Sequence, residues 1–319
     1  MSFFKRITPL VLCLFAACGG EATLEPLSGN SRASTTDAGA TGGTGGSSKP
    51  AADSGTMALA DAGYDDGCSA EARDVYVISH GGDLYRFAPK KLEFTKIGAV
   101  KCGPYFTKLS VYSMAVDRDS NAWVLDSQGV VWKVSTRDAT CEATTYVKNT
   151  QSFSVFGMGI TANAAGSKAE SLFIAGGGPL PNSQSLGTID LVTKSVTRLG
   201  TFTDGLAAFP AELTGTADGR LYGFFPRAPK PTLALINKAT GATPKANQVE
   251  LPGIPVGGGF AFSFWGGDFW FYSSNTSATS SSVARYKASG DKSVSVVVAS
   301  TGFVIVGAGV SSCAPLVFE

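Results

Sequence analysis

The sequence predicts an all-β protein, a single five-bladed β-propeller closed by pairing between its N-terminal and C-terminal strands. A pattern of short strands and polar turns recurs about every 40–50 residues over residues 68–319, a period typical of propellers and solenoids. Aromatic and β-branched residues are frequent there, and no amphipathic helical pattern of useful length occurs. The strand that is missing at one end of the series is present in excess at the other.

Each repeat is expected to begin with an inner strand of small residues, which suits the crowded centre of a ring. These strands are at 113–116, 157–160, 212–215, 260–263 and 305–310. The next strand is aromatic, at 75–77, 122–124, 172–174, 221–223 and 269–271. Another strand follows at 84–87, 131–134, 187–190, 234–237 and 284–286. After a polar turn, most repeats add one more, as at 93–98, 195–200 and 294–298.

The two ends of the series complement each other. The aromatic strand at 75–77 has no inner strand before it, whereas the inner strand at 305–310 has no aromatic strand after it. Together they complete one blade, and a closed ring protects strand edges that would otherwise pair with other chains. A six-bladed ring and a two-sheet β-sandwich are the alternatives.

Residues 1–17 predict a secretory signal peptide. Two basic residues precede about eleven mostly apolar ones, a run too short to span a bilayer. The small residues before Cys18 resemble the lipobox of bacterial lipoproteins, although Phe15 stands where that family usually has leucine. The resemblance implies that Cys18 is acylated and becomes the mature N-terminus, and that Gly19 directs the protein to the outer membrane. Cleavage without lipidation and an ordinary buried apolar segment are the alternatives.

Residues 18–67 predict a flexible tether after the acylated cysteine. The segment consists of Gly, Ser, Thr, Ala and Asp with almost no large apolar residue, so it cannot bury enough surface to offset the entropy of ordering. A coil of this length has a root-mean-square reach of roughly 35–40 Å. A mucin-like glycosylated stalk is the alternative.

The charge balance argues against some partners. The chain has 26 Lys and Arg against 25 Asp and Glu, a net charge of +1. We therefore expect no nucleic-acid partner and no electrostatic attraction to an anionic membrane, so that membrane contact is through the lipid anchor only. The roughly 250 residues of 68–319 permit one large or two small domains, and the repeat favours one.

Four cysteines remain once Cys13 leaves with the signal peptide and Cys18 is acylated, and an even number in an exported chain predicts two disulfides. In a closed propeller Cys313 ends the last inner strand and Cys68 precedes the strand beside it, so we expect these two to join. Cys102 and Cys141 are then left to link adjacent blades. A zinc site is the alternative, although no CxxC or CxxH spacing occurs.

The residues whose side chains are capable of catalysis or metal binding have simpler explanations. His80, the single histidine, lies in a Ser-His-Gly-Gly turn, and one histidine excludes a multi-histidine metal site. The Asp-Arg-Asp-Ser-Asn run that starts at Asp117 has oxygen ligands at calcium-loop spacing but fits a turn between strands better. Trp265 is expected to pack between blades rather than to stack on a ligand. No GxSxG elbow or phosphate loop occurs.

Residues 115–119, 264–270 and 302–310 resemble secreted lipoproteins abundant in myxobacteria, a largely uncharacterised family whose resemblance implies no particular activity. We therefore expect a monomeric, non-catalytic binding module in the bacterial cell envelope, with no catalytic residue, metal site or cofactor. Its partner would be a peptide, a glycan or an envelope protein, contacted through loops 176–185 and 225–231. A metal-assisted hydrolase or lyase with Glu212 and Asp117 in the central channel is the alternative, and a purely structural envelope component is a third possibility.

Overall fold

The computed structural model describes residues 67–102, 110–177 and 182–318. The predicted signal peptide, Cys18 and residues 19–66 of the predicted tether lie outside the described residues, as does part of the 176–185 loop. Within the described ranges, no helix has the length and apolar character needed to cross a bilayer. The helical segments there are the short 3-10 turns η1 (Glu71–Arg73), η2 (Thr150–Ser152) and η3 (Lys245–Asn247).

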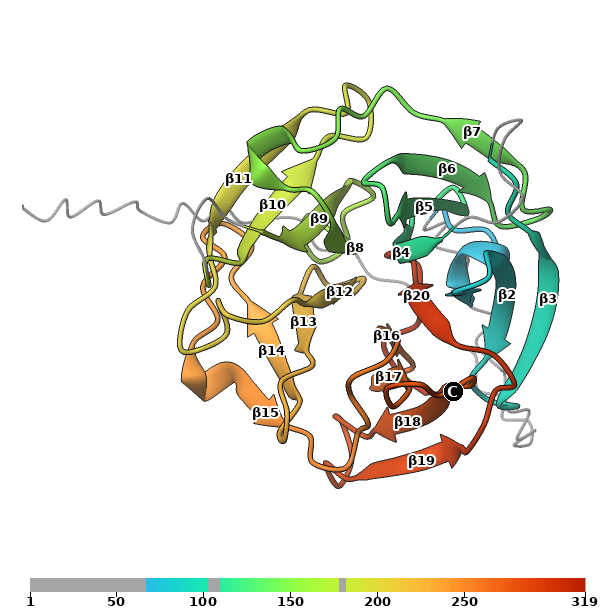
Figure 1. Cartoon of the computed structure of the whole chain (residues 1–319), viewed down its shortest axis with the longest axis vertical. Helices are drawn as coiled ribbons and strands as arrows, with labels where there is room; N and C mark the ends of the chain where they lie inside the picture. Colours follow the sequence, from blue (N-terminus) through green and yellow to red (C-terminus); the bar gives the residue numbers. More distant parts are fainter. Residues whose placement is uncertain (1–66, 103–109, 178–181, 319) are drawn as a thin grey trace, which may run out of the picture. The chain divides into compact units, whose positions relative to one another are not determined.

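The described strands form five four-stranded antiparallel sheets arranged as the blades of a β-propeller (Figure 1). The first blade contains β20 (Ile305–Gly309), β1 (Val75–Ser79), β2 (Asp83–Ala88) and β3 (Glu93–Ala99). The second contains β4 (Val111–Val116), β5 (Asn121–Asp126), β6 (Val131–Ser135) and β7 (Cys141–Ala143). The third contains β8 (Phe156–Ala162), β9 (Glu170–Gly176), β10 (Ser185–Ile189) and β11 (Val196–Thr201).

The last two blades repeat the same order. The fourth contains β12 (Glu212–Gly215), β13 (Leu221–Phe225), β14 (Thr232–Ile236) and β15 (Gln248–Glu250). The fifth contains β16 (Phe260–Trp265), β17 (Asp268–Ser273), β18 (Ser282–Tyr286) and β19 (Val294–Val298). The five-bladed propeller predicted from the repeat is confirmed. Outer strands β7 and β15 were not predicted, because three residues are too few to show a period.

The ring closes through the two ends of the chain, as the sequence predicts. Strand β20 pairs antiparallel with β1, with Tyr76 opposite Gly309 and Ile78 opposite Gly307. In Figure 1 the red β20 accordingly lies beside the blue strands of the first blade. Residues at the two ends of the described domain thus complete one sheet, and no inner strand of the ring is left without its blade.

Hydrophobic clusters fill the spaces between neighbouring blades. One cluster packs Tyr76 and Ile78 of the first blade against Met114 and Val124 of the second. Corresponding clusters lie at the other four interfaces formed by the described residues. Trp265 is 9% exposed and packs between the fifth and first blades, so the prediction that it belongs to the core is confirmed.

Glycines allow the inner strands to approach one another closely. A Cβ added at Gly157 of β8 would fall on the carbonyl oxygen of Ala211, just before β12. At Gly159 it would lie 2.7 Å from the backbone of Leu213. The small residues predicted for the inner strands are therefore a packing requirement of a narrow ring.

Replacement of Gly157 by alanine should destabilise the fold. The methyl group has backbone rather than a flexible side chain in its way, so β8 and β12 must separate, an overpacking cost of about 1–3 kcal/mol. Urea unfolding of Gly157→Ala and of Gly81→Ala measures the effect. Gly81 is the matched control, because its added Cβ would meet only the Ser79 hydroxyl, at 3.7 Å. Equal stabilities would contradict this account of the ring.

The two faces of the ring differ in their connections. Inner strands β4, β8, β12 and β16 are entered through connections of nine or more residues, such as 144–155 and 251–259, on a side that we call the loop face. They leave through shorter turns, such as 117–120 and 266–267, on a side that we call the turn face. The described ends of the 176–185 loop and the loop at 225–231 also lie on the loop face, because each loop joins the second strand of a blade to the third. Long loops placed on a rigid scaffold commonly carry recognition.

Candidate functional site

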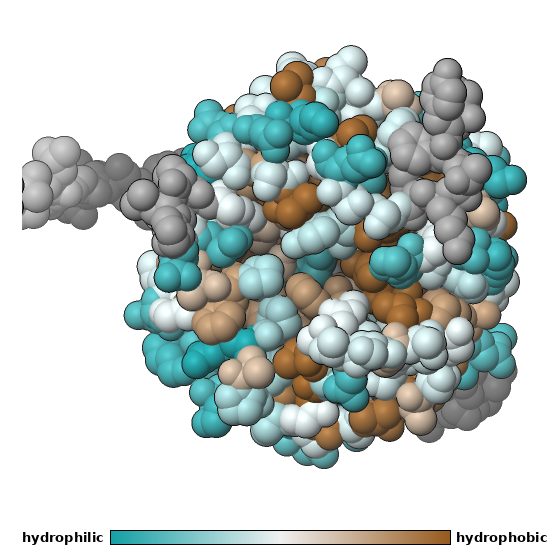
Figure 2. Space-filling model, viewed as in Figure 1, coloured by the Kyte–Doolittle hydropathy of each residue, from teal (hydrophilic) through white to brown (hydrophobic). Residues whose placement is uncertain are grey.

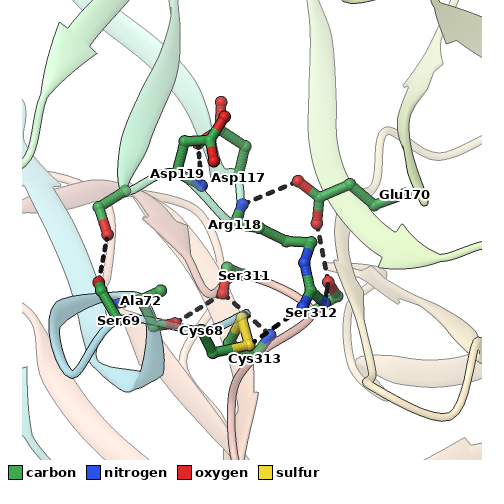
Figure 3. The surroundings of a disulfide bond; sticks show 11 residues. Cys68, Ser69, Ala72, Asp117, Arg118, Asp119, Glu170, Ser311, Ser312 and Cys313 are labelled. Atoms are coloured by element: carbon green, nitrogen blue, oxygen red, sulfur yellow. Dashed lines mark hydrogen bonds between the residues drawn. A yellow bond between two sulfur atoms is a disulfide. The ribbon is translucent and has the colours of Figure 1, made fainter. Parts of the chain in front are cut away.

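Two disulfides join the four cysteines in the expected pairs. Cys68 bonds to Cys313 across a separation of 245 residues, and Cys102 bonds to Cys141 across 39 residues. The first bond lies on the turn face and ties the segment before β1 to the segment after β20 (Figure 3). The second links the first and second blades, since Cys102 follows β3 and Cys141 begins β7.

A polar cluster surrounds the Cys68–Cys313 bond on the turn face. Arg118, in the turn after β4, donates from Nη1 to Ser312 Oγ at 3.0 Å and from Nη2 to Cys68 Sγ at 3.3 Å. Glu170, at the start of β9, accepts from the Arg118 backbone N–H and from Ser312 Oγ, both at 2.8 Å. Figure 3 shows these side chains converging from separate blades on the bond that closes the ring. The cluster therefore couples the second and third blades to the chain ends.

In this cluster, the protein environment shifts the pKa of the Glu170 carboxyl. Burial raises the pKa of Glu170 to about 7, and the nearby charge of Asp117 adds to the increase. Hydrogen bonds from Arg118 and Ser312 oppose it. The folded-state pKa therefore lies above the unfolded value near 4.5, so folding takes up a proton between those two pH values.

The Glu170 contribution to stability should be fully present below about pH 4.5 and should be lost as the pH rises through 7. Because the side chain is partly exposed, solvent screens part of the effect. Between pH 4.5 and pH 8 we expect the free energy of unfolding of wild type to fall by on the order of 1–2 kcal/mol more than that of Glu170→Gln. Urea unfolding at both pH values measures this difference. Glu142→Gln, which removes an exposed acid on β7, is the control and should keep the wild-type profile. Parallel profiles for wild type and Glu170→Gln would refute the prediction.

A cavity of about 410 Å³ lies beside this cluster on the turn face. Arg73, Arg118 and Lys168 contribute three cationic side chains to its lining, against one acid, Asp218. Asp218 forms an ion pair with Arg220 at 2.7 Å, so the lining has an excess of positive charge. The last described residues, including Leu316, form an apolar part of the same wall.

Asp117 has a structural role in the turn after β4. Its Oδ1 accepts the backbone N–H groups of Asp119 at 3.0 Å and Asn121 at 2.8 Å, and its Oδ2 accepts the Trp123 indole N–H at 2.9 Å. These donors occupy the oxygens that a calcium loop would direct at a metal. The turn interpretation of this segment is the one that the structure shows. His80 likewise lies in the β1–β2 turn and is exposed.

Glu212 lies at the opposite end of the channel, where β12 begins on the loop face. The residue is 3% exposed, and its Oε2 accepts the Ser113 hydroxyl at 2.7 Å. Ser113 Oγ in turn accepts the Met158 backbone N–H at 3.0 Å, so three inner strands hold the carboxyl in place. Desolvation raises the pKa of Glu212 well above its usual value, and these hydrogen bonds only partly oppose the shift.

A cavity of about 160 Å³ opens at this end of the channel. Its wall combines the Glu212 carboxyl with the aromatic side chains of Tyr112 and Phe260 and with small or aliphatic residues, namely Val111, Gly258, Gly259 and Val306. Burial and the Glu212 charge raise the pKa of Tyr112 to about 12. The described part of the wall thus holds one acid and no basic side chain.

The structure does not bring Glu212 and Asp117 together. The Ser113 hydroxyl donates to Glu212, and Ser113 lies four residues before Asp117 on extended chain. The Glu212 end of the channel is therefore about 13 Å along the strand from Asp117. Across the described ranges, no group of three or more His, Cys, Asp or Glu side chains is placed to hold a metal ion. The geometry therefore does not favour the hydrolase alternative.

The sequence reasoning missed the partners of these acids. Ser113 was predicted to lie in an inner strand, and a polar residue at such a position was a signal that it had a buried partner. Tyr112 precedes it and was not considered. Nothing local marked Glu170 or Ser312, because their contacts come from segments far apart in the sequence.

No family model matches this chain, and no curated protein matches it. Solved structures with a similar fold include TolB from Acinetobacter baumannii, with 11% identity over 70% of this chain and 52% of that chain and a TM-score of 0.38. The calcium-binding protein regucalcin from Agrobacterium tumefaciens is 14% identical over 71% of each chain, with a TM-score of 0.38. The Dos1 propeller is 8% identical over 70% of this chain and 55% of that chain, with a TM-score of 0.36. This chain therefore spans about half the length of TolB and of the Dos1 chain.

Proposed function

We propose that the protein is a non-catalytic binding module of the bacterial cell envelope, which captures a peptide, glycan or envelope protein on the loop face of its propeller. The observation that carries the proposal is that the two faces of the ring differ: the chain enters the domain on the turn face, whereas the long connections lie on the loop face. The described chain begins at Gly67, beside the disulfide of the turn face, so the predicted tether is attached on that side. The loop face, with its longer connections and its cavity, is thereby left to meet a partner.

The surface chemistry supports recognition of a protein. The face drawn in Figure 2 has apolar residues, in brown, over β20 and around the centre of the ring, with polar residues in teal among them and at the rim. Apolar residues at the core of a patch are typical of protein interfaces. The near-zero net charge fits this class of partner better than nucleic acid.

The proposal includes anchorage by a lipid on Cys18, followed by a tether to residue 67, in the manner of the myxobacterial lipoproteins that the sequence resembles. Acylation of a cysteine with several chains gives a stable anchor, where one chain is marginal. Cys18→Ser should therefore move the protein from the membrane fraction to the soluble fraction of cells. Retention of the variant in the membrane fraction would contradict lipid anchorage.

Photo-crosslinking in intact cells tests the binding face. A photoreactive residue is placed at Val147, which is 69% exposed in the 144–155 connection of the loop face. The matched control is Val192, 87% exposed in the β10–β11 turn of the turn face. We expect a discrete crosslinked partner from position 147 and none from position 192. Crosslinks from 192 alone, or from neither position, would refute the proposed function.

A further inference from the structure

We propose that the loop-face cavity binds a primary ammonium group on an alkyl stem, the lysine side chain of a partner protein, with the Glu212 carboxylate as its counter-ion. This inference rests on the proposed function and names the chemistry of its ligand. Three features carry it, namely the charge, the wall and the size of the cavity.

The charge of the cavity favours a cation. Among the residues that the structure describes, Glu212 is the one carboxyl in the wall, and no Lys, Arg or His side chain lines it. The carboxyl is 3% exposed, and the Ser113 hydroxyl is a neutral donor. A carboxylate buried without a counter-ion is costly, so an ammonium group that enters the cavity supplies the missing charge.

The wall suits an alkyl stem that ends in a charge. Val111 and Val306 provide aliphatic surface for methylene groups, and the glycines at 258–259 let the stem approach the backbone. Tyr112 and Phe260 place aromatic rings in the same wall, and such rings attract an ammonium group within about 6 Å.

The size of the cavity matches one linear side chain. Its volume of about 160 Å³ is that of roughly five water molecules, at ~30 Å³ each. A lysine side chain has five non-hydrogen atoms beyond Cα. The cavity thus accepts one lysine from a partner whose remaining surface rests on the surrounding loops.

Protonation of Glu212 should make the affinity of the site depend on pH. Desolvation raises the pKa of Glu212 and so favours its protonated form in the free protein, whereas a bound ammonium group favours the carboxylate. Within the described ranges, the one other ionisable group in the cavity wall is Tyr112, whose pKa of about 12 keeps it neutral, and β16 and β20 contribute no charge. Affinity for a lysine ligand should therefore rise with pH, by up to about tenfold per pH unit while Glu212 is protonated in the free protein.

The test measures binding of the full processed chain, purified in detergent, to a capped Gly-Gly-Lys-Gly-Gly peptide by calorimetry. The same peptide with norleucine or Nε-acetyl-lysine in place of lysine removes the charge at nearly constant shape, and n-butylamine presents the ammonium group without a peptide. We expect at least tenfold weaker binding of both uncharged peptides. We also expect tighter binding of the lysine peptide than of n-butylamine, whereas equal binding would overturn a protein partner in favour of a free amine.

Variants separate the site from the rest of the ring. Glu212→Gln keeps the size of the side chain and should weaken binding of the lysine peptide at least tenfold, whereas Glu170→Gln alters a half-buried acid on the turn face and should not. Should Glu212→Gln fail to fold, the rise of wild-type affinity with pH and the proton released on binding decide the question. Equal binding of lysine and norleucine peptides, or a pH-independent affinity, would overturn the ammonium site. If the ammonium site is overturned but position 147 still crosslinks a partner, the proposed binding function stands without the ammonium site.

Discussion

Removal of residues 303–319 is expected to prevent the closed propeller from forming. The deletion takes away β20, which pairs along β1 and supplies Ile305, Ala308 and Val310 to the core between the fifth and first blades. Each buried aliphatic side chain contributes roughly 1.5–3 kcal/mol, so the loss is comparable with the whole stability of many domains, about 5–15 kcal/mol. Near-ultraviolet circular dichroism and limited proteolysis of the truncated chain measure the outcome.

The deletion also removes Cys313, so its effect must be separated from that of the disulfide. Cys313→Ser in the full chain retains β20 and serves as the control, and it should keep native near-ultraviolet signals that the truncated chain lacks. A truncated chain that folds and melts like the intact one would show that β20 does not close the ring.

Loss of the ring-closing disulfide should cost more than loss of the inter-blade one. Replacing Cys68 and Cys313 together by serine frees a loop of 245 residues, whereas replacing Cys102 and Cys141 frees one of 39 residues. The chain-entropy model makes the first bond worth about 5.5 kcal/mol and the second about 3.9 kcal/mol, a difference of about 1.6 kcal/mol, where a native disulfide of a small secreted domain usually contributes about 2–5 kcal/mol. Each double variant avoids an unpaired thiol.

Urea unfolding of the two double variants under non-reducing conditions measures this difference, with mass mapping of the remaining bond as the check on pairing. The β20–β1 pairing persists in both variants, so both should fold. A larger loss from the Cys102 and Cys141 pair would mean that strain or local packing, rather than the length of the closed loop, sets the contribution of each bond.

The positions of the acids explain why a binding module is favoured over a hydrolase. Propeller enzymes that use a metal need several ligands at one point of the channel, and here the predicted pair lies at opposite ends of it. Asp117 uses both oxygens on donors of its own turn and of the following strand β5. Glu212 accepts the Ser113 hydroxyl and faces a cavity with apolar and aromatic walls, an environment that suits recognition of one complementary group.

The sequence by itself determined the fold of this protein. Alternation of small and aromatic strands is a local, periodic property, so five blades can be counted without coordinates. The unpaired strand patterns near 75 and 305 predicted the closing blade, and the disulfide pairing followed from that closure. Strands β7 and β15 could not be predicted from the sequence. Each has three residues, which are held by backbone hydrogen bonds to a neighbouring strand and show no periodic pattern of their own.

Only the tertiary structure decided which side chains meet in the channel. Ser113 and Glu212 are 99 residues apart and bond across the ring, whereas Arg118 reaches Ser312 over 194 residues. Such contacts depend on the radius of the ring and on the register of each blade, which no local pattern encodes. The raised pKa of Glu170 and that of Glu212 follow from the same cause, because burial among several blades, rather than neighbours in the sequence, removes water from these carboxyls.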